Sequence, residues 1–180
     1  MFGRSETVAD VGTVAAAELQ VVPRRPLGCG EMGCAFDVDD GEVMKVTTDE
    51  REISAVEAIV EDGIFDGFPE VRRPPVRLRS FGDERQVYAY VREAVTPIAR
   101  QDVPRPIAEL LPVLIGSAST RSASIYLATL NRLAPHAPAL FALGQRLFAR
   151  GLLLADVHRG NLGLRTNGTI VAFDVQVVPA

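Results

Sequence analysis

In the first half of the chain, apolar and polar residues alternate in short runs, which is the pattern of a half-buried β-strand. Two such runs occupy residues 34–38 and 42–46, and Asp39-Asp40-Gly41 stands between them. An Asp-Gly pair in this position is typical of a β-hairpin turn. An extended segment from residue 27 leads into the first run through a glycine-rich stretch, so we expect three consecutive strands.

Two further strands are expected later in this half. They cover residues 76–80 and 86–92 and are joined by a turn at Gly82-Asp83. Before them, residues 63–69 indicate one loop and Pro74-Pro75 indicates another, because glycine and proline favour turns and interrupt strands. The pattern therefore predicts an antiparallel sheet with long connections.

Apolar residues recur at helical spacing in five other segments. These segments are residues 5–19, 49–62, 107–117, 122–133 and 139–150. Capping residues flank several of them: Ser5 begins the first, Thr48 or Asp49 precedes the second, and Gly151 follows the last. The C-terminal half is therefore expected to be largely helical.

A second hairpin is expected near the C-terminus. Residues 161–164 and 169–173 are mostly apolar and flank Thr166-Asn167-Gly168, a strong turn signal. Strands first, helices next and a late hairpin predict an α+β fold. The division between a strand-rich and a helical part is expected near residues 93–97.

The composition predicts one soluble domain. The chain has 180 residues, of which 47% are hydrophobic, so it is long enough for one well-packed core. Its apolar runs are too short to span a membrane, and Arg4, Glu6 and Asp10 do not fit a signal peptide. We therefore expect a cytoplasmic location. The net charge of −4 argues against general nucleic-acid binding.

Cysteine and lysine are both rare. Cys29 and Cys34 are too few for a four-ligand zinc site, and we interpret them as small residues beside a tight backbone. Lys45 is the only lysine among 19 cationic residues. Because a compact ammonium and a planar guanidinium do different chemistry, this position indicates a specific role.

The stretch Gly28-Cys29-Gly30-Glu31-Met32-Gly33 matches the pattern G-x-G-x-x-G. Glycines at this spacing let backbone N–H groups approach phosphates, both in dinucleotide-binding proteins and in kinases. A dinucleotide fold needs a helix directly after the last glycine and an acid about 20 residues further on, where Asp49 and Glu50 stand. The hairpin expected after Gly33 favours the kinase arrangement.

Lys45 ends the apolar run Val43-Met44, one hairpin after the glycine-rich loop. An ammonium there is close to bound phosphates and needs a carboxylate to orient it. In the helix that follows, Glu52 lies on the side of the apolar stripe and is our choice. Glu50 and Glu61 remain alternatives.

A polar loop with the pattern D-x-H-x-x-N follows the last helix and contains Asp156, His158 and Asn161. An aspartate in such a loop can accept a hydroxyl proton, and an asparagine oxygen can ligate Mg²⁺. Asp174 follows the apolar run 170–173. A carboxylate at the end of a buried strand is either paired or binds a metal, so these residues together predict a magnesium-dependent site.

In this order, the glycine-rich loop, the strand lysine, the helix acid, D-x-H-x-x-N and the strand-end aspartate resemble the protein-kinase-like superfamily. The resemblance covers residues 27–176. Its D-x-H-x-x-N form is most similar to aminoglycoside phosphotransferases and small bacterial or phage kinase-like proteins. It implies a single domain with a two-lobed fold: an N-lobe of antiparallel sheet plus helix at residues 1–93, and a reduced helical C-lobe at residues 94–180.

The resemblance also implies which residues bind ATP. They would be Gly28, Gly30, Gly33, Lys45, Glu52, Glu93 and Val95. Lys45 would pair with the α- and β-phosphates and Glu52 with Lys45. Residues 90–95 would be a hinge that offers backbone hydrogen bonds to adenine.

For the chemistry, the resemblance implies that Asp156 is the catalytic base and that Asn161 and Asp174 are the Mg²⁺ ligands. His158 would be structural, packed behind the loop. The sequence departs from the eukaryotic kinase pattern in two places, because Ala155 replaces the arginine before the catalytic aspartate and Val175-Gln176 replaces Phe-Gly after the metal-binding one.

We therefore expect an ATP- and Mg²⁺-dependent phosphotransferase, a Ser/Thr-type protein kinase that acts on itself or on a partner protein. The alternatives are a catalytically silent nucleotide-binding regulatory module, a small-molecule phosphotransferase and, less favoured, a dinucleotide-binding protein. The few residues after Asp174 lead us to expect no regulation by an activation loop. Acceptor positioning would then come from a second copy, from a partner protein or from the helices expected between residues 107 and 150, and the apolar segment 175–178 is a candidate contact surface.

Overall fold

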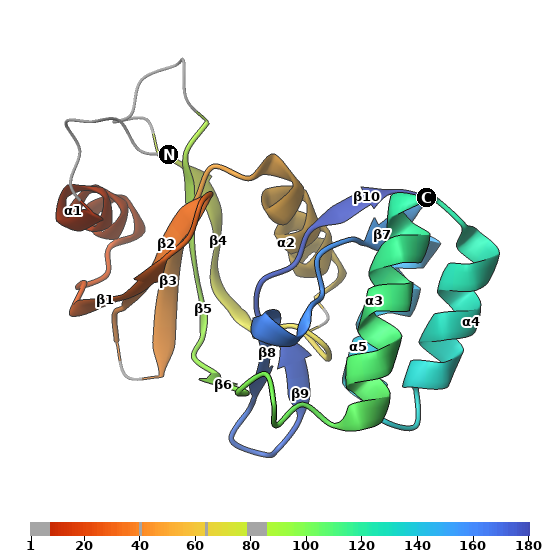
Figure 1. The fold of residues 1–180 in the computed structure, drawn as a ribbon. Coiled ribbons are helices and arrows are strands. Elements are labelled where there is room, and N and C mark those ends of the chain that lie inside the picture. Colours follow the sequence, from red (N-terminus) through yellow and green to blue (C-terminus); the bar gives the residue numbers. More distant parts are fainter. Residues whose placement is uncertain (1–7, 40, 64, 79–85) are drawn as a thin grey trace. The chain divides into compact units, whose positions relative to one another are not determined.

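The computed structural model describes residues 8–39, 41–63, 65–78 and 86–180 (Figure 1). Ser5, the turn at Gly82-Asp83 and Asp40 in the first hairpin turn lie outside the described residues. The chain forms two compact units, of which the first comprises Met1–Glu57 and Glu70–Ala94. The second comprises Ala58–Pro69 and Val95–Ala180. The boundary after Ala94 lies within the range expected from the sequence, whereas the sequence did not indicate that residues 58–69 join the second unit.

The first unit contains a five-stranded antiparallel sheet in the order β1-β2-β3-β5-β4. Its strands are β1 (Arg25–Cys29), β2 (Gly33–Asp37), β3 (Glu42–Thr47), β4 (Val71–Arg77) and β5 (Tyr88–Glu93). The predicted hairpin of β2 and β3 is confirmed, with Phe36 opposite Met44. Gly41 in its turn has a φ of 79°, which glycine adopts without strain. The central strand of the sheet is β3.

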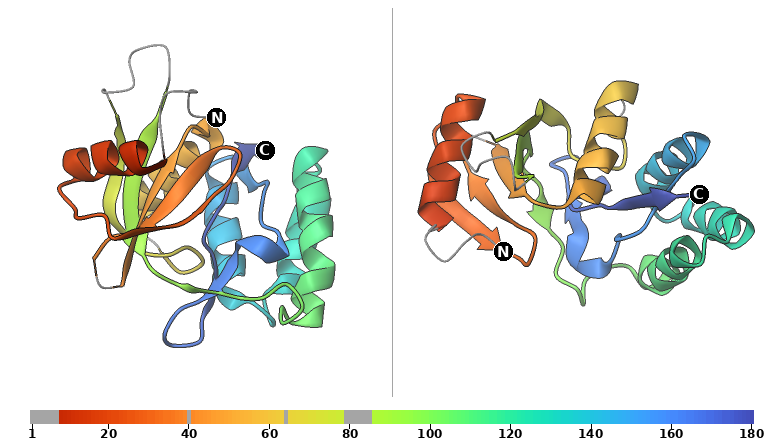
Figure 2. Two further views of the ribbon diagram at one scale, coloured as in Figure 1. Left: turned by 60° about the vertical axis from the view of Figure 1, so that its left-hand side comes forward. Right: turned by 90° about the horizontal axis from the view of Figure 1, so that it is seen from above.

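Helix α1 (Val8–Leu19) covers one face of this sheet (Figure 2). Its apolar side chains form one core with alternate strand residues such as Phe36 and Met44. The contact is close at Gly12, where an added Cβ would lie 2.6 Å from the ring of Phe36. Because successive strand residues point to opposite faces, Lys45 lies on the face away from α1.

Helix α2 (Glu50–Asp62) follows β3 after a short connection. Asp49 caps it, since one carboxylate oxygen accepts a hydrogen bond from the N–H of Arg51 at 2.9 Å. The hydroxyl of Thr47 in turn accepts one from the N–H of Asp49 at 3.1 Å. Of the two caps expected from the sequence, Asp49 is therefore the one that is used.

The expected loop at Pro74-Pro75 is wrong, because both prolines lie within β4. This strand is at the edge of the sheet, where a residue without an N–H donor is tolerated. The pairing of β4 with β5 shifts register between Arg73 and Val76, so the prolines interrupt the hydrogen-bonded ladder without ending the strand.

Three helices dominate the second unit. They are α3 (Arg105–Ser119), α4 (Ala123–Leu133) and α5 (Pro138–Ala149), close to the ranges expected from the sequence. A core that includes Leu114, Tyr126 and Leu130 lies among them. Gly151 follows α5 with a φ of 74°, as its predicted capping role requires.

Two small sheets complete the second unit. One pairs β7 (Leu152–Leu154) with β10 (Val177–Pro179), and the other has the order β6 (Thr96–Pro97), β8 (Leu162–Leu164), β9 (Ile170–Ala172). The predicted late hairpin is confirmed as β8 and β9. The sequence did not predict β6 or β7, because strands of two or three residues are too short to show alternation. Strand β10 overlaps the apolar segment 175–178, which was expected to present a strand edge.

The apolar segment near the C-terminus is paired. Val177 lies opposite Leu154 in the β7–β10 ladder, and the side chains of Val175 and Val177 are buried. Burial and pairing within the chain thus account for Val175 and Val177, while β10 is paired on one side only, so the expectation that residues 175–178 form a contact surface stays a prediction.

The described residues thus form an α+β fold with antiparallel sheets, as expected. Within these residues, no helix combines the length and the apolar character that crossing a membrane requires.

Candidate functional site

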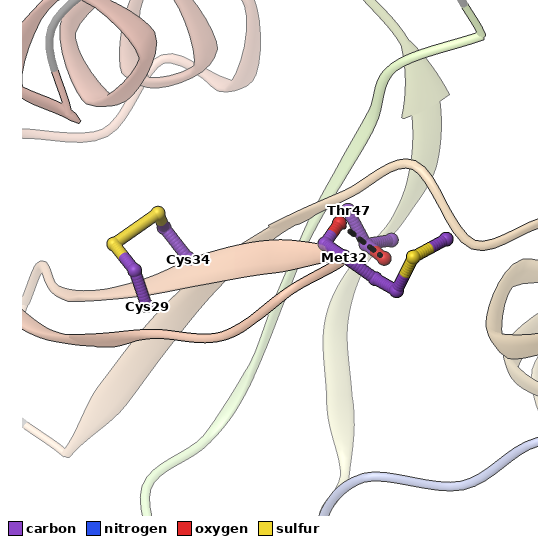
Figure 3. The surroundings of a disulfide bond; sticks show 4 residues. All are labelled: Cys29, Met32, Cys34 and Thr47. Carbon is purple, nitrogen blue, oxygen red and sulfur yellow. Dashed lines mark hydrogen bonds between the residues drawn. A yellow bond between two sulfur atoms is a disulfide. The ribbon is translucent and has the colours of Figure 1, made fainter. Parts of the chain in front are cut away.

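The glycine-rich loop connects β1 to β2 in the first unit. It is closed by a hydrogen bond from the N–H of Gly30 to the carbonyl oxygen of Gly33 at 2.8 Å. The carbonyl oxygen of Met32 accepts hydrogen bonds from the N–H of Thr48 at 2.8 Å and from the Thr47 hydroxyl at 3.5 Å (Figure 3). The tip of the loop is therefore tied to the end of β3.

The three glycines of the motif differ in what the fold requires of them. At Gly33, an added Cβ would lie 2.2 Å from the carbonyl oxygen of Val46, so only glycine permits this approach of β2 to β3. At Gly28 and Gly30, a Cβ would meet nothing within 4 Å, and neither residue has a positive φ. Packing thus explains Gly33, whereas neither packing nor backbone conformation requires glycine at positions 28 and 30.

Cys29 and Cys34 form a disulfide, so our interpretation of them as merely small residues beside a tight backbone is wrong. The two residues lie opposite each other in the β1–β2 pair, with their Cα atoms 4.1 Å apart. Cys29 is exposed, whereas Cys34 is buried. The signal that we missed is the hairpin, since two cysteines that flank a four-residue loop face each other once the strands pair.

Lys45 and Glu52 form a buried ion pair in the first unit. The Lys45 Nζ lies 3.4 Å from Oε1 of Glu52, and their side chains are 13% and 3% exposed. Tyr90, which lies opposite Lys45 in β5, donates its hydroxyl hydrogen to the same oxygen at 2.8 Å. The strand lysine is thus held by a carboxylate that is itself oriented by a tyrosine.

Glu52 is therefore the acid of α2 that meets Lys45. The alternatives differ: Glu50 is exposed, and Glu61 pairs with Arg150 at 2.7 Å in the second unit. Burying two charges has a high desolvation cost, which attraction at this distance offsets only in part. A pair of this kind is weak evidence for stability alone, so its burial favours a functional role. Nothing in the local sequence pattern indicated Tyr90 as its third member.

The expected hinge shows a more restricted geometry than the resemblance implies. Residues of β5 are paired within the sheet, and the N–H of Glu93 donates to the carbonyl oxygen of Glu70 at 2.8 Å. The Arg92 guanidinium donates to the Glu93 carbonyl oxygen at 3.1 Å, and the N–H of Ala94 donates to Gly41 at 2.7 Å. A hydrogen bond from the Glu93 N–H to adenine would therefore have to replace its bond to Glu70. Val95 is the first residue of this segment that belongs to the second unit.

In the second unit, the Asp156 loop and the segment around Asp174 lie side by side. The N–H of Ala155 donates to the carbonyl oxygen of Gln176, and the N–H of Phe173 donates to that of Asn161, both at 2.8 Å. These two bonds bracket Asp156 on one segment and Asp174 on the other. The fold thus brings together the three residues that the sequence assigned to the chemistry.

Asn161 is buried and has a defined orientation. Its side-chain N–H₂ donates to the carbonyl oxygen of Asp156 at 3.1 Å, which leaves the amide oxygen as the acceptor end of the group. Oxygen is the donor atom that Mg²⁺ requires, and one or two carboxylates or amides with substrate phosphates form its usual shell. Asn161 and Asp174 therefore fit a nucleotide-bound magnesium ion in donor chemistry.

His158 has a structural role, although not the one expected. Its Nδ1 accepts a hydrogen bond from the N–H of Gly160 at 3.0 Å and so caps the short helix η2 (Arg159–Asn161). The neutral ring then carries its proton on Nε2, which lies 3.9 Å from a carboxylate oxygen of Asp156. The expectation that His158 packs behind the loop is wrong, since the side chain is about half exposed.

Within the described part of the chain, no group of three or more His, Cys, Asp or Glu side chains is placed to hold a metal ion by itself. No protein-family model matches the chain, and no curated protein matches it in sequence. The function is therefore inferred from the chemistry of two groups of residues, Lys45 with Glu52 and Tyr90, and Asp156 with Asn161 and Asp174.

Proposed function

We propose that this protein is an ATP- and Mg²⁺-dependent phosphotransferase with a kinase-like two-lobed fold. The observation that carries the proposal is the buried Lys45–Glu52 pair on the strand that follows the glycine-rich loop. The lysine is the only one in the chain, and α1 covers the opposite face of its sheet. An oriented ammonium next to a loop of backbone N–H groups is suited to binding phosphates.

In this proposal the first unit binds the nucleotide. Lys45 pairs with the α- and β-phosphates, while Glu52 and Tyr90 hold its side chain in position. Gly28 and Gly30 let the loop backbone approach the phosphates. This explains why glycine stands at these two positions, where packing does not require it.

The second unit supplies the chemical groups. Asp156 accepts the proton of the attacking hydroxyl, and the backbone bonds of Ala155 and Asn161 keep its loop in place. The amide oxygen of Asn161 and the carboxylate of Asp174 hold Mg²⁺. The bound ion would neutralise charge on the phosphate oxygens. We take the acceptor to be a Ser or Thr hydroxyl of this protein or of a partner.

Nucleotide binding is tested by thermal unfolding with and without Mg-ATP. A ligand that binds only the native state raises the melting temperature. Asp174→Ala should remove the magnesium-dependent part of this shift, whereas Asp102→Ala, which removes an exposed acid of the same unit, should not. An unchanged melting temperature of the wild-type protein at millimolar Mg-ATP would overturn the proposal.

Phosphotransfer is tested with γ-labelled ATP, with the protein itself and generic peptides as acceptors. Asp156→Asn keeps the shape of the side chain but removes the proton acceptor, so transfer should fall about 10²- to 10⁴-fold while the thermal shift persists. Full transfer by this variant would show that Asp156 is not the base. A wild-type protein that binds Mg-ATP without any transfer would instead identify a regulatory nucleotide-binding module.

A further inference from the structure

The Cys29–Cys34 disulfide lies at the base of the glycine-rich loop, on the face of the sheet opposite Lys45. Cys34 shares its face of β2 with Phe36, in the core beneath α1. Ala35, between them, lies opposite Lys45 in β3 and points the other way. The disulfide therefore constrains the loop from the face of the sheet opposite Lys45 and does not itself occupy the Lys45 face.

The loop is fixed at two separate points, both of which Figure 3 shows. One point is the disulfide, and the other is the carbonyl oxygen of Met32, which is bound to Thr47 and Thr48. Only Gly30 and Glu31 lie between the disulfide-bonded Cys29 and Met32. Loss of the disulfide would free the strand side of the loop while leaving the other anchor in place.

We propose that Cys29 and Cys34 are a reversible thiol–disulfide switch that sets the order of the glycine-rich loop, and that the disulfide form binds the phosphates of Mg-ATP more tightly. The second clause rests on the function proposed above. A loop that is already ordered loses less conformational freedom on binding. The disulfide form thus has the lower entropic cost.

The switch operates by exchange with a dithiol reductant. A thiolate of the reductant attacks the sulfur of Cys29, the exposed member of the pair, and the bond to Cys34 breaks. The Cys34 sulfur leaves as a thiolate and takes a proton. The second thiolate of the reductant then attacks the reductant sulfur that is bonded to Cys29, and Cys29 leaves as a thiolate and takes a proton. The reductant is released as a disulfide, so two electrons have passed to the cysteines.

Reduction should weaken Mg-ATP binding about tenfold, since ordering the backbone of a single residue corresponds to roughly one factor of ten in affinity. Linkage requires the reciprocal effect: saturating Mg-ATP makes the disulfide about tenfold harder to reduce. For this two-electron couple, tenfold corresponds to about 30 mV.

The test compares the oxidised and reduced wild-type protein by calorimetric titration with Mg-ATP, with complete reduction verified by alkylation and mass spectrometry. Cys29→Ser/Cys34→Ala is the control. Because the chain has only these two cysteines, reductant should leave the affinity of the double variant unchanged, at the value of the reduced wild-type protein. Equal affinities of the two wild-type forms would overturn the switch while leaving the proposed function intact.

Hydrogen exchange provides a readout that does not depend on nucleotide. The amide of Gly30, which donates to Gly33, should exchange faster after reduction, whereas that of Thr48, which donates to Met32, should keep its protection. If neither form binds Mg-ATP, the proposed function fails and these amides decide the redox proposal. Equal protection of Gly30 in both forms would overturn it.

Discussion

The charges of Lys45 and Glu52 are the strongest candidates for a functional role, and a double-mutant cycle separates that role from stability. At 3.4 Å, two unit charges attract each other by about 5 kcal/mol at an effective dielectric constant of about 20. Desolvation offsets part of this attraction, and breaking a fully buried pair costs about 3–5 kcal/mol. Because Lys45 is 13% exposed and keeps some hydration, we expect a coupling energy of about 2–3 kcal/mol.

The variants are Lys45→Met, Glu52→Gln and their combination. Glutamine keeps an oxygen that can accept the hydroxyl hydrogen of Tyr90, so Glu52→Gln removes the charge while retaining this bond. Urea unfolding gives the free energy of each variant, and thermal shift gives its response to Mg-ATP. The double variant should recover much of the stability that each single variant loses, but none of the response to Mg-ATP.

Arg105 and Glu109 on α3 are the matched control pair. Their charged atoms are closer, at 2.7 Å, but their side chains are 89% and 61% exposed. Water screens such a pair, so Arg105→Met and Glu109→Gln should show much weaker coupling than the buried pair and should leave the thermal shift unchanged. Coupling between Lys45 and Glu52 as weak as that of the control would refute the burial argument. A thermal shift that persists in Lys45→Met would show that the pair is structural.

Two further predictions concern stability. Burial raises the pKa of Tyr126 to about 12 from 10.0, so the free energy of unfolding should fall as the pH rises through this interval. Urea unfolding at neutral and alkaline pH should show that Tyr126→Phe removes about 3 kcal/mol of that fall, and an identical slope in the variant would contradict the assignment. The disulfide closes a loop at a sequence separation of 5, for which chain entropy gives a loss of about 2 kcal/mol on reduction. The same loss should appear in Cys29→Ser/Cys34→Ala, and a reduced protein as stable as the oxidised one would argue against it.

Features that depend on neighbours in the sequence were predictable. The β2–β3 hairpin follows from the Asp39-to-Gly41 turn, and the cap at Asp49 sets the register of α2. The apolar stripe of this helix places Glu52 on its buried side, which favours it over Glu50 and Glu61. Local periodicity and turn chemistry suffice for decisions of this kind.

Features that depend on strand pairing were not predictable. Tyr90 meets Glu52 from 38 positions away, because β5 pairs with β3 although the two strands are distant in the sequence. The β7–β10 ladder likewise joins a strand that precedes Asp156 to a strand that follows Asp174. Pro74-Pro75 misled for the same reason, since the cost of a missing N–H depends on whether a strand lies at the edge of its sheet.

The glycine-rich loop allows structural and functional glycines to be distinguished by experiment. A Cβ at Gly33 would meet the backbone oxygen of Val46, which belongs to the paired strand and cannot rotate away. Gly33→Ala should therefore cost about 1–3 kcal/mol, as overpacking does, with β2 and β3 forced apart. Gly30 has open space around it, so Gly30→Ala should change stability by less than about 1 kcal/mol and can even stabilise the protein by restricting the unfolded chain.

Binding should respond in the opposite order. If the backbone at Gly30 approaches phosphates, a methyl group there obstructs them, and Gly30→Ala should lose most of the Mg-ATP thermal shift while unfolding normally in urea. Gly116→Ala is the control, because this glycine lies in α3, far along the chain, with nothing within 4 Å of an added Cβ. It should retain the full shift. A Gly30→Ala variant with an unchanged shift would mean that the loop does not approach the nucleotide, and that Gly28 and Gly30 need an explanation other than phosphate binding.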